Sequence, residues 1–220
     1  MLANNILALL KSLNLKTKLP AGIKAMNPYQ DSSAFALCRA FYTRFYNDNK
    51  PRTLILGINP GRFGGGITGI PFTDPIKLET RCGIKNELPK KAELSADFIY
   101  TMISAYGGEK KFYDKFYISA VCPLGFVKDG KNLNYYDSPE LQHAVYNFCV
   151  QSIQQQINFG LNREICYCLG EGKNFDFLSR LNSEYQFFKQ VIPLPHPRFI
   201  MQYRRKRVQE YIDRYLEELK

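Results

Sequence analysis

The sequence predicts an α/β protein, a three-layer α/β/α sandwich with a central four-stranded parallel sheet. Two observations lead to this fold class: four short segments are rich in β-branched and aromatic residues, and segments with helical spacing of apolar residues separate them. A chain of 220 residues that is 45% hydrophobic can bury one core of this kind. We therefore expect residues 1–220 to form a single domain, with an N-terminal helical segment of about residues 1–48 packed on it.

The four predicted strands are almost continuously apolar, as expected for strands with both faces covered. They are residues 53–57, 115–121, 164–170 and 188–194. Strands that alternate with helices indicate right-handed crossovers, and ligands of such sheets bind at the carboxyl ends of the strands. The segments that follow the first, second and fourth strands are therefore expected to meet at one edge.

Helices are predicted wherever apolar residues recur every three or four positions. The helix from about residue 139 to 157 also has a start signal, because Ser138 suits the N-cap and Pro139 the first turn. The other predicted helices lie at about residues 2–13, 35–45, 98–103, 172–182 and 202–219.

The composition indicates the class of binding partner and the cellular compartment. The net charge of +10 favours a phosphate-bearing partner. The six cysteines contain no C-x-x-C pair, so we expect reduced, mostly buried thiols, no disulfide frame, no metal and no cofactor. The amino terminus has no basic leader and no apolar run near the ~18 residues of a membrane span. These features predict a cytoplasmic protein without a membrane segment.

A glycine-rich loop follows the first predicted strand. Residues 57–66, GINPGRFGGG, contain five glycines, and Gly64-x-Gly66-x-x-Gly69 matches the dinucleotide fingerprint by its letters. The fingerprint requires a helix next, whereas Ile70-Pro71-Phe72 follows, and the lysine of a phosphate-binding Walker loop is also missing. Two interpretations remain: a flexible turn, or a loop whose bare backbone allows close approach of a ligand or of another part of the chain.

The segment after the fourth strand combines a histidine, an apolar trio and a basic run. Basic residues crowd the start of the predicted last helix, where the helix dipole disfavours cations, so they indicate either phosphate binding or a solvated charge run: Arg198, Arg204, Arg205, Lys206 and Arg207. Phe199-Ile200-Met201 suits insertion into a base stack, or core packing under the loop. His196 lies between two prolines that fix its backbone, which marks it as a functional candidate, whereas His143 fits a helix surface.

These motifs together resemble a known family. Residues 57–64, GINPGRFG, and 68–72, TGIPF, are similar to the first motif of the single-strand-selective monofunctional uracil-DNA glycosylases, within the uracil-DNA glycosylase superfamily. Cys122-Pro123-Leu124, residues 130–133 (GKNL) and His196-Pro197 resemble that family's later motifs, and residues 26–29 (MNPY) resemble its entry segment. The resemblance covers nearly the whole chain, from about Met26 to the last helix.

The resemblance implies a site and a mechanism. The target nucleotide is flipped out of the DNA stack, because its glycosidic bond cannot be reached inside a duplex. Asn59 matches the residue that orients the attacking water, and His196 matches the donor to the carbonyl of the departing base. Phe72 matches the aromatic that stacks on the base, and Gly61 leaves room where other branches carry a tyrosine. Backbone amides around Ile58 and Phe63 are expected near the base or a flanking phosphate.

Two departures from the family pattern concern base selection and DNA contact. Ala120, with Ser119 beside it, stands where the family has a base-reading asparagine, so we expect weaker uracil activity or wider base tolerance. Main-chain groups at Ala120 or Val121, or preference for another deaminated base, are the alternatives. Arg198 stands where the family has serine, either as a phosphate clamp or as a wedge together with Phe199.

Three functions fit the sequence. The favoured one is a monofunctional glycosylase that removes uracil, 5-modified uracil, xanthine or hypoxanthine from single- or double-stranded DNA. No lysine at a motif position suggests a Schiff-base lyase. The alternatives are a noncatalytic DNA-damage-binding protein with the same fold and a small-molecule nucleotide enzyme. We expect a monomer, associated with the nucleoid if the source is bacterial.

Overall fold

The computed structural model describes residues 1–219 and contains the predicted parallel sheet. Its four strands run parallel in the order β3-β2-β6-β7. They are β2 (Thr53–Gly57), β3 (Phe116–Ala120), β6 (Asn162–Leu169) and β7 (Gln190–Leu194), each within two residues of the predicted bounds. The α/β fold class and the four parallel strands are therefore confirmed.

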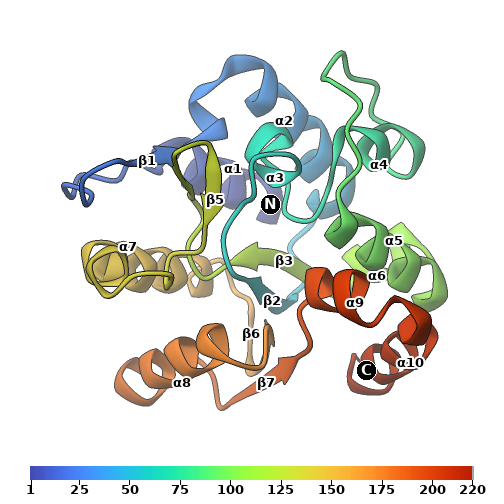
Figure 1. Cartoon of the computed structure of the whole chain (residues 1–220). Coiled ribbons are helices and arrows are strands. Elements are labelled where there is room, and N and C mark those ends of the chain that lie inside the picture. The colour runs from blue at the N-terminus through green and yellow to red at the C-terminus, as the bar shows by residue number, and fades with distance from the viewer. Residues whose placement is uncertain (220) are drawn as a thin grey trace.

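Helices cover both faces of this sheet, with α7 and α8 on one side and α5 and α10 on the other (Figure 1). The longer helices are α1 (Leu2–Ser12), α2 (Ser32–Tyr46), α5 (Leu94–Tyr106), α7 (Pro139–Ile157), α8 (Lys173–Tyr185) and α10 (Val208–Glu218). The shorter ones are α3 (Gly65–Thr68), α4 (Pro75–Thr80), α6 (Glu109–Tyr113), α9 (Pro197–Tyr203) and the 3₁₀ turns η1 (Pro28–Gln30) and η2 (Arg205–Arg207).

A second, antiparallel sheet of the order β1-β4-β5 is absent from the sequence prediction. Its strands are β1 (Ile23–Met26), β4 (Gly125–Lys128) and β5 (Lys131–Leu133). Asp129 and Gly130 join β4 to β5 with φ angles of 49° and 69°, the conformation that a two-residue hairpin turn requires. This hairpin brings β5 beside the glycine-rich loop that follows β2.

The last helix differs from the prediction, which placed it at about residues 202–219. The chain instead forms α9, η2 and α10. Pro197 is suited to the first turn of a helix and His196 caps it, so the helical segment begins earlier than the apolar spacing indicates. Arg204 then breaks the helix with φ −130° and ψ 20°. As a result Arg198 and Phe199 lie on α9, and only the later basic residues precede α10.

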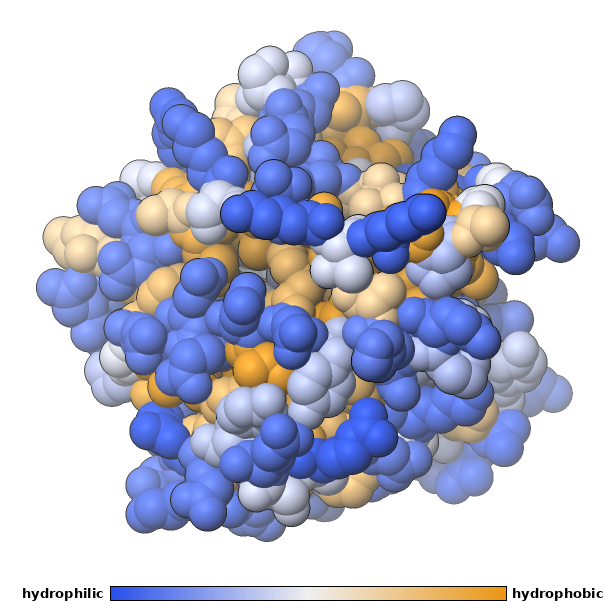
Figure 2. Space-filling view, turned by 90° about the vertical axis from the view of Figure 1, so that its left-hand side faces the viewer, coloured by the Kyte–Doolittle hydropathy of each residue, from blue (hydrophilic) through white to orange (hydrophobic). Residues whose placement is uncertain are grey.

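Polar groups cover most of the face that carries β1, β5 and α7, and hydrophobic groups show mainly in its hollows (Figure 2). All six cysteines are buried and unbridged. Within residues 1–219, no helix has the length and apolar character that a membrane crossing demands. The same residues contain no group of three or more His, Cys, Asp or Glu side chains arranged to hold a metal ion.

Arg52, just before β2, is a fully buried cation at the amino end of the sheet. Its guanidinium donates to the backbone carbonyls of Tyr113 at 2.7 Å and Lys50 at 2.8 Å, and it makes a two-point ion pair with Asp48. A buried charge of this kind is tolerated because each of its three nitrogens has a hydrogen-bond partner. Arg52 therefore ties the start of β2 to the end of α6.

We expect Arg52→Leu to lower the free energy of unfolding by about 3 kcal/mol, because it removes the donor to the buried Tyr113 carbonyl, to the Lys50 carbonyl and to the Asp48 carboxylate. Urea titration followed by circular dichroism measures the change. Arg39→Leu, at an exposed position of α2, is the matched control and should shift the free energy by less than about 0.5 kcal/mol. Equal effects of the two substitutions would contradict this role of Arg52.

Candidate functional site

The glycine-rich loop is built around the ring of Phe72. A Cβ on Gly57, the last residue of β2, would lie 2.8 Å from two carbons of that ring. Phe72 has a φ of 52°, a left-handed conformation that is strained for an aromatic residue. The buried hydroxyl of Thr68 supports this turn by donating to the carbonyl of Thr73 at 2.7 Å and accepting from the amide of Ile70 at 3.1 Å.

Two further glycines face other parts of the chain. A Cβ on Gly66 would lie 2.5 Å from the carbonyl oxygen of Gly61, and one on Gly64 would lie within 2.6 Å of the Glu93 carboxyl carbon. The contact at Gly66 is with backbone and requires glycine, whereas at Gly64 the close group is the end of the flexible Glu93 side chain. Close approach, one of the two interpretations of the sequence, is thus found at this loop, and the approaching groups belong to the chain itself.

Asn59 follows β2 and is held by its amide at both ends. Its Oδ1 accepts from the Tyr135 backbone amide at 3.0 Å, and its Nδ2 donates to the Leu133 carbonyl at 3.1 Å. These partners fix which end of the amide carries the oxygen. The oxygen keeps a second lone pair that can accept from a water or a ligand.

His196 is the N-cap of α9, and its protonation is set by that role. Its Nδ1 accepts from the backbone amide of Arg198 at 3.1 Å, so the proton of the neutral ring lies on Nε2. Burial, helped by the cationic Arg198, lowers the pKa of His196 to about 4. The ring is therefore a neutral hydrogen-bond donor at pH 7, and its centroid lies 5.9 Å from that of Phe72.

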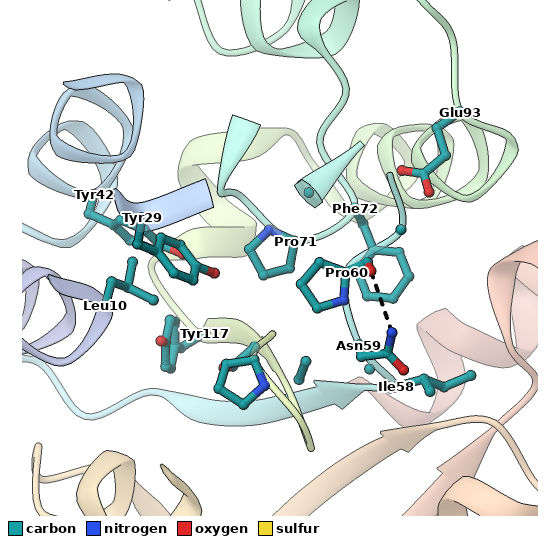
Figure 3. A pocket seen from close by; sticks show the side chains of 16 residues that line it. Leu10, Tyr29, Tyr42, Ile58, Asn59, Pro60, Pro71, Phe72, Glu93 and Tyr117 are labelled. Carbon is teal, nitrogen blue, oxygen red and sulfur yellow. Dashed lines mark hydrogen bonds between the residues drawn. The ribbon is translucent and has the colours of Figure 1, made fainter. Parts of the chain in front are cut away.

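The residues predicted for base binding lie around one pocket at the carboxyl edge of the sheet (Figure 3). Ile58, Asn59, Gly61, Phe72, Ser119 and Ala120 line it. His196, Arg198 and Phe199 line an adjoining groove that shares Ile58, Asn59, Gly61 and Phe72 with the pocket. The structure thus brings the two candidate catalytic residues to one continuous surface.

Phe63, which is expected among the residues of the base pocket, does not line it. It lies outside the pocket, in a neighbouring groove with Arg62 and Arg198, and the Lys91 ammonium is 3.7 Å from its ring centroid. Its position suits a contact with DNA flanking the target better than a contact with the base.

The two backbone amides that follow Ala120 are already bonded within the chain. The Val121 amide donates to the Gly57 carbonyl at 2.9 Å, and the Cys122 amide donates to the Ile58 carbonyl at 3.1 Å. Ser119 is buried and lines the pocket. Side-chain hydroxyls, rather than these amides, are the polar groups available on this wall.

Not all three residues of the predicted apolar trio, 199–201, are exposed on α9. Phe199 is exposed, but Ile200 is fully buried in the core and Met201 is half-buried. The second exposed ring is Tyr203, one turn along the helix, with its centroid 5.8 Å from that of Phe199. Tyr203 lies four residues after Phe199 and directly before the basic run, and this spacing on a helix is the signal that would have identified it.

The predicted basic residues form an exposed group near these two rings. The Arg204 guanidinium lies 5.3 Å from the Phe199 ring centroid, and Arg205 and Lys206 are exposed on η2. Arg207 pairs with Glu210 at 2.6 Å, which neutralises part of the group. Arg198 is exposed on α9 and reaches both grooves beside the pocket.

Glu93, ahead of α5, is a site residue that the sequence analysis missed. Its carboxyl packs on Gly64 and lines both the pocket and the two grooves. Burial and the nearby Asp74 raise its pKa to about 7, against the opposing effect of Arg198. No spacing or motif in the flanking lysine- and proline-rich loop marks this residue.

The fold and the site define a class of protein: a three-layer α/β protein with a ligand pocket at the carboxyl edge of its parallel sheet, formed by an asparagine loop, a stacking aromatic and a histidine-capped helix. A model of the family described as "Uracil DNA glycosylase superfamily" matches residues 43–220, and the chain belongs to this superfamily.

One solved structure shows how far the similarity extends. The structure described as "The crystal structure of WT Pedobacter heparinus SMUG2" shares 47% sequence identity with this chain and has a TM-score of 0.97. The match covers 99% of this chain and 96% of the other. The family and this likeness support a DNA glycosylase activity.

The His196 protonation state gives a direct prediction. In a pH titration followed by ¹H–¹⁵N NMR, Nε2 of His196 should keep its proton and Nδ1 should stay unprotonated down to a pKa of about 4. A His143→Gln variant assigns the signals. Because the folded-state pKa lies below that of the unfolded chain, about 6.5, His196 lowers stability as the pH falls from about 6.5 to 4. A titration of this ring near pH 6.5 would contradict the assignment.

Proposed function

We propose that this chain is a monofunctional DNA glycosylase that flips a deaminated or oxidised base out of DNA and hydrolyses its N-glycosidic bond in base excision repair. The candidate bases are uracil, 5-modified uracil, xanthine and hypoxanthine. The observation that carries the proposal is the convergence of the fixed Asn59 amide, the neutral His196 ring and Phe72 at one pocket edge. We further propose that it acts on DNA as a monomer in the cytoplasm, at the nucleoid of a bacterial cell.

Base extrusion is the first step of the proposed mechanism. A base inside a duplex is shielded by its neighbours, so the nucleotide must rotate into the pocket. Phe72 offers a ring face on which the extruded base stacks. Phe199 and Tyr203 are exposed apolar side chains on the adjoining helix, suited to occupy the vacated stack while the nearby arginines hold phosphates.

Bond breaking must lead the hydrolysis, because the residue on the water side is an amide. Asn59 cannot remove a proton from water as a carboxylate does. Its Oδ1 can accept from a water and orient it toward the sugar carbon, which becomes oxocarbenium-like as the base departs. The bonds to Leu133 and Tyr135 hold this oxygen in place before substrate arrives.

His196 would stabilise the departing base. As the glycosidic bond breaks, negative charge develops on the base and its carbonyl oxygens. The Nε2–H of a neutral imidazole, fixed by the Nδ1 bond to Arg198, donates to such an oxygen without first transferring a proton. The low pKa keeps this donor in one form across neutral pH.

Monofunctional chemistry is part of the proposal. A glycosylase that also cleaves the strand needs an amine nucleophile at the sugar carbon. Within residues 1–219, the side chains that line the pocket and the groove beside it include no lysine. We expect an intact abasic strand as the product.

Ala120 favours a second candidate, a noncatalytic DNA-damage-binding protein that retains the fold. Without the base-reading asparagine, the pocket would hold extruded bases with little selection between them. Oligonucleotides carrying uracil, 5-hydroxymethyluracil, hypoxanthine or xanthine separate the two candidates. An abasic site detected by alkaline cleavage supports the glycosylase, and its absence for every base at high enzyme and low salt supports the binding protein.

The catalytic assignment predicts that Asn59→Ala and His196→Ala each lower the single-turnover rate of base release by about 10²–10³-fold, the usual cost of removing one positioned polar group. Affinity for the same oligonucleotide should fall much less. His143→Ala, the other histidine of the chain, is the matched control and should keep the parental rate. A double Asn59→Ala, His196→Ala variant with the parental rate would overturn the site.

The exposed basic group predicts a distinction between two neighbouring arginines. Arg205→Ala should weaken binding to all DNA sequences and reduce the slope of log affinity against log salt by about 1. Arg207→Ala should have a smaller effect, because Glu210 already neutralises that charge. Filter binding at several salt concentrations measures both. Equal slopes for Arg205→Ala and the parental protein would exclude Arg205 from the DNA interface.

A further inference from the structure

The pocket continues past the position of Phe72 to an inner end formed by tyrosines. Figure 3 shows Leu10, Tyr29, Tyr42 and Tyr117 at this end, opposite Asn59, Phe72 and Glu93. The four inner residues come from α1, η1, α2 and β3, so separate segments of the chain converge here. The tyrosine side chains are 5%, 1% and 1% exposed for Tyr29, Tyr42 and Tyr117, so only small parts of them reach open space.

The hydroxyls at this inner end differ from other buried tyrosines of the chain. Tyr46 donates to the Phe116 carbonyl at 3.0 Å, and Tyr215 donates to the Pro195 carbonyl at 2.6 Å. Among residues 1–219, the Tyr29 and Tyr42 hydroxyls make no such bond to a backbone carbonyl, yet neither is among the fully enclosed polar atoms that lack a partner. The Tyr117 hydroxyl has the Ser119 hydroxyl as its neighbour. Because buried hydroxyls are normally paired, polar groups of this kind that line a pocket indicate a ligand or ordered water.

These tyrosines stay protonated, so their hydroxyls can donate hydrogen bonds. Burial is the main cause that raises the pKa of Tyr29, Tyr42 and Tyr117, and their mutual proximity adds to the effect for Tyr29 and Tyr42. Each therefore remains an uncharged hydroxyl that can donate one hydrogen bond and accept others. The side chain of Ser119, two residues after Tyr117 on the same strand face, adds a fourth hydroxyl.

The wall between these hydroxyls and Asn59 has little else that can recognise a base. Ala120 has an apolar side chain, and the amides of Val121 and Cys122 are already bonded within the chain. Pro71 and Pro123, which also line this part of the pocket, have no amide hydrogen. The tyrosine and serine hydroxyls are thus the side-chain polar groups at the end of the pocket opposite Asn59.

We propose that Tyr29, Tyr42, Tyr117 and Ser119 read the extruded base, binding the carbonyl groups at its edge opposite the glycosidic bond, directly or through one water. This inference rests on the proposed function and deepens it. A hydroxyl rotates to donate or accept, whereas an asparagine amide presents both in fixed places. These four hydroxyls therefore accept several carbonyl-bearing bases, and they select against an amino group less strictly than an asparagine amide does.

Binding to hydrolysis-resistant DNA tests base recognition by these hydroxyls separately from catalysis. The probes are two oligonucleotides that carry 2′-fluoro-2′-deoxyuridine or 2′-fluoro-2′-deoxycytidine at one position, since the fluorine suppresses oxocarbenium formation. The parental protein should bind the uracil probe more tightly. Tyr29→Phe and Tyr117→Phe should each reduce this preference about five-fold, the effect of one neutral hydrogen bond, and the double variant should reduce it further.

Tyr46→Phe is the matched control, because Tyr46 is equally buried in the same aromatic cluster but its hydroxyl bonds to the Phe116 carbonyl. It should keep the parental preference. Thermal unfolding of each variant confirms that the fold is intact. The inference is overturned if the parental protein does not distinguish the probes, or if the folded phenylalanine variants distinguish them equally well. Preferential binding of the uracil probe, without base release from ordinary DNA that carries any of the four candidate bases, would instead refute the proposed glycosylase and leave the inference on base reading standing.

Discussion

The contact between the Phe72 ring and the bare α-carbon of Gly57 is the constraint on which the site depends. It lets an aromatic ring rest on the end of β2, at the point where a side chain would otherwise project. The strained backbone of Phe72 is maintained because the buried Thr68 hydroxyl bonds both sides of the turn. The ring of Phe72 is therefore seated against the end of the central strand β2.

The second sheet completes this arrangement from the other side. Asn59 is two residues beyond Gly57, and its amide bonds to Leu133 at the end of β5 and to Tyr135 just after it. The loop is thus held between the parallel sheet and the β4–β5 hairpin. Residues that are distant in sequence fix the ring and the amide independently, which is how a site can be ordered before its ligand binds. Preorganisation of this kind reduces the cost of arranging charge and water at the moment of reaction.

The sequence predicted the elements with strong periodicity and missed those formed by short or convergent segments. Continuous apolar runs identified the four parallel strands. The family resemblance identified Asn59 and Phe72 as candidates, and the flanking prolines together with that resemblance identified His196. The strands of the second sheet have three or four residues, too few to show a period, although Asp129-Gly130 is a hairpin signal. Glu93 and the inner tyrosines have no common spacing, because four or more separate segments bring them together only in the folded chain.

The bond from the Arg198 amide to Nδ1 of His196 joins two events that are usually treated separately. The same nitrogen that sets the tautomer also caps the helix that presents Phe199 and Tyr203. A proton added at Nδ1 would remove the acceptor and release the first turn of α9, so loss of the neutral donor and loosening of the exposed rings are thermodynamically linked. Protonation of this one ring would therefore act at two places, on the hydrogen bond that its Nε2 can donate and on the start of α9.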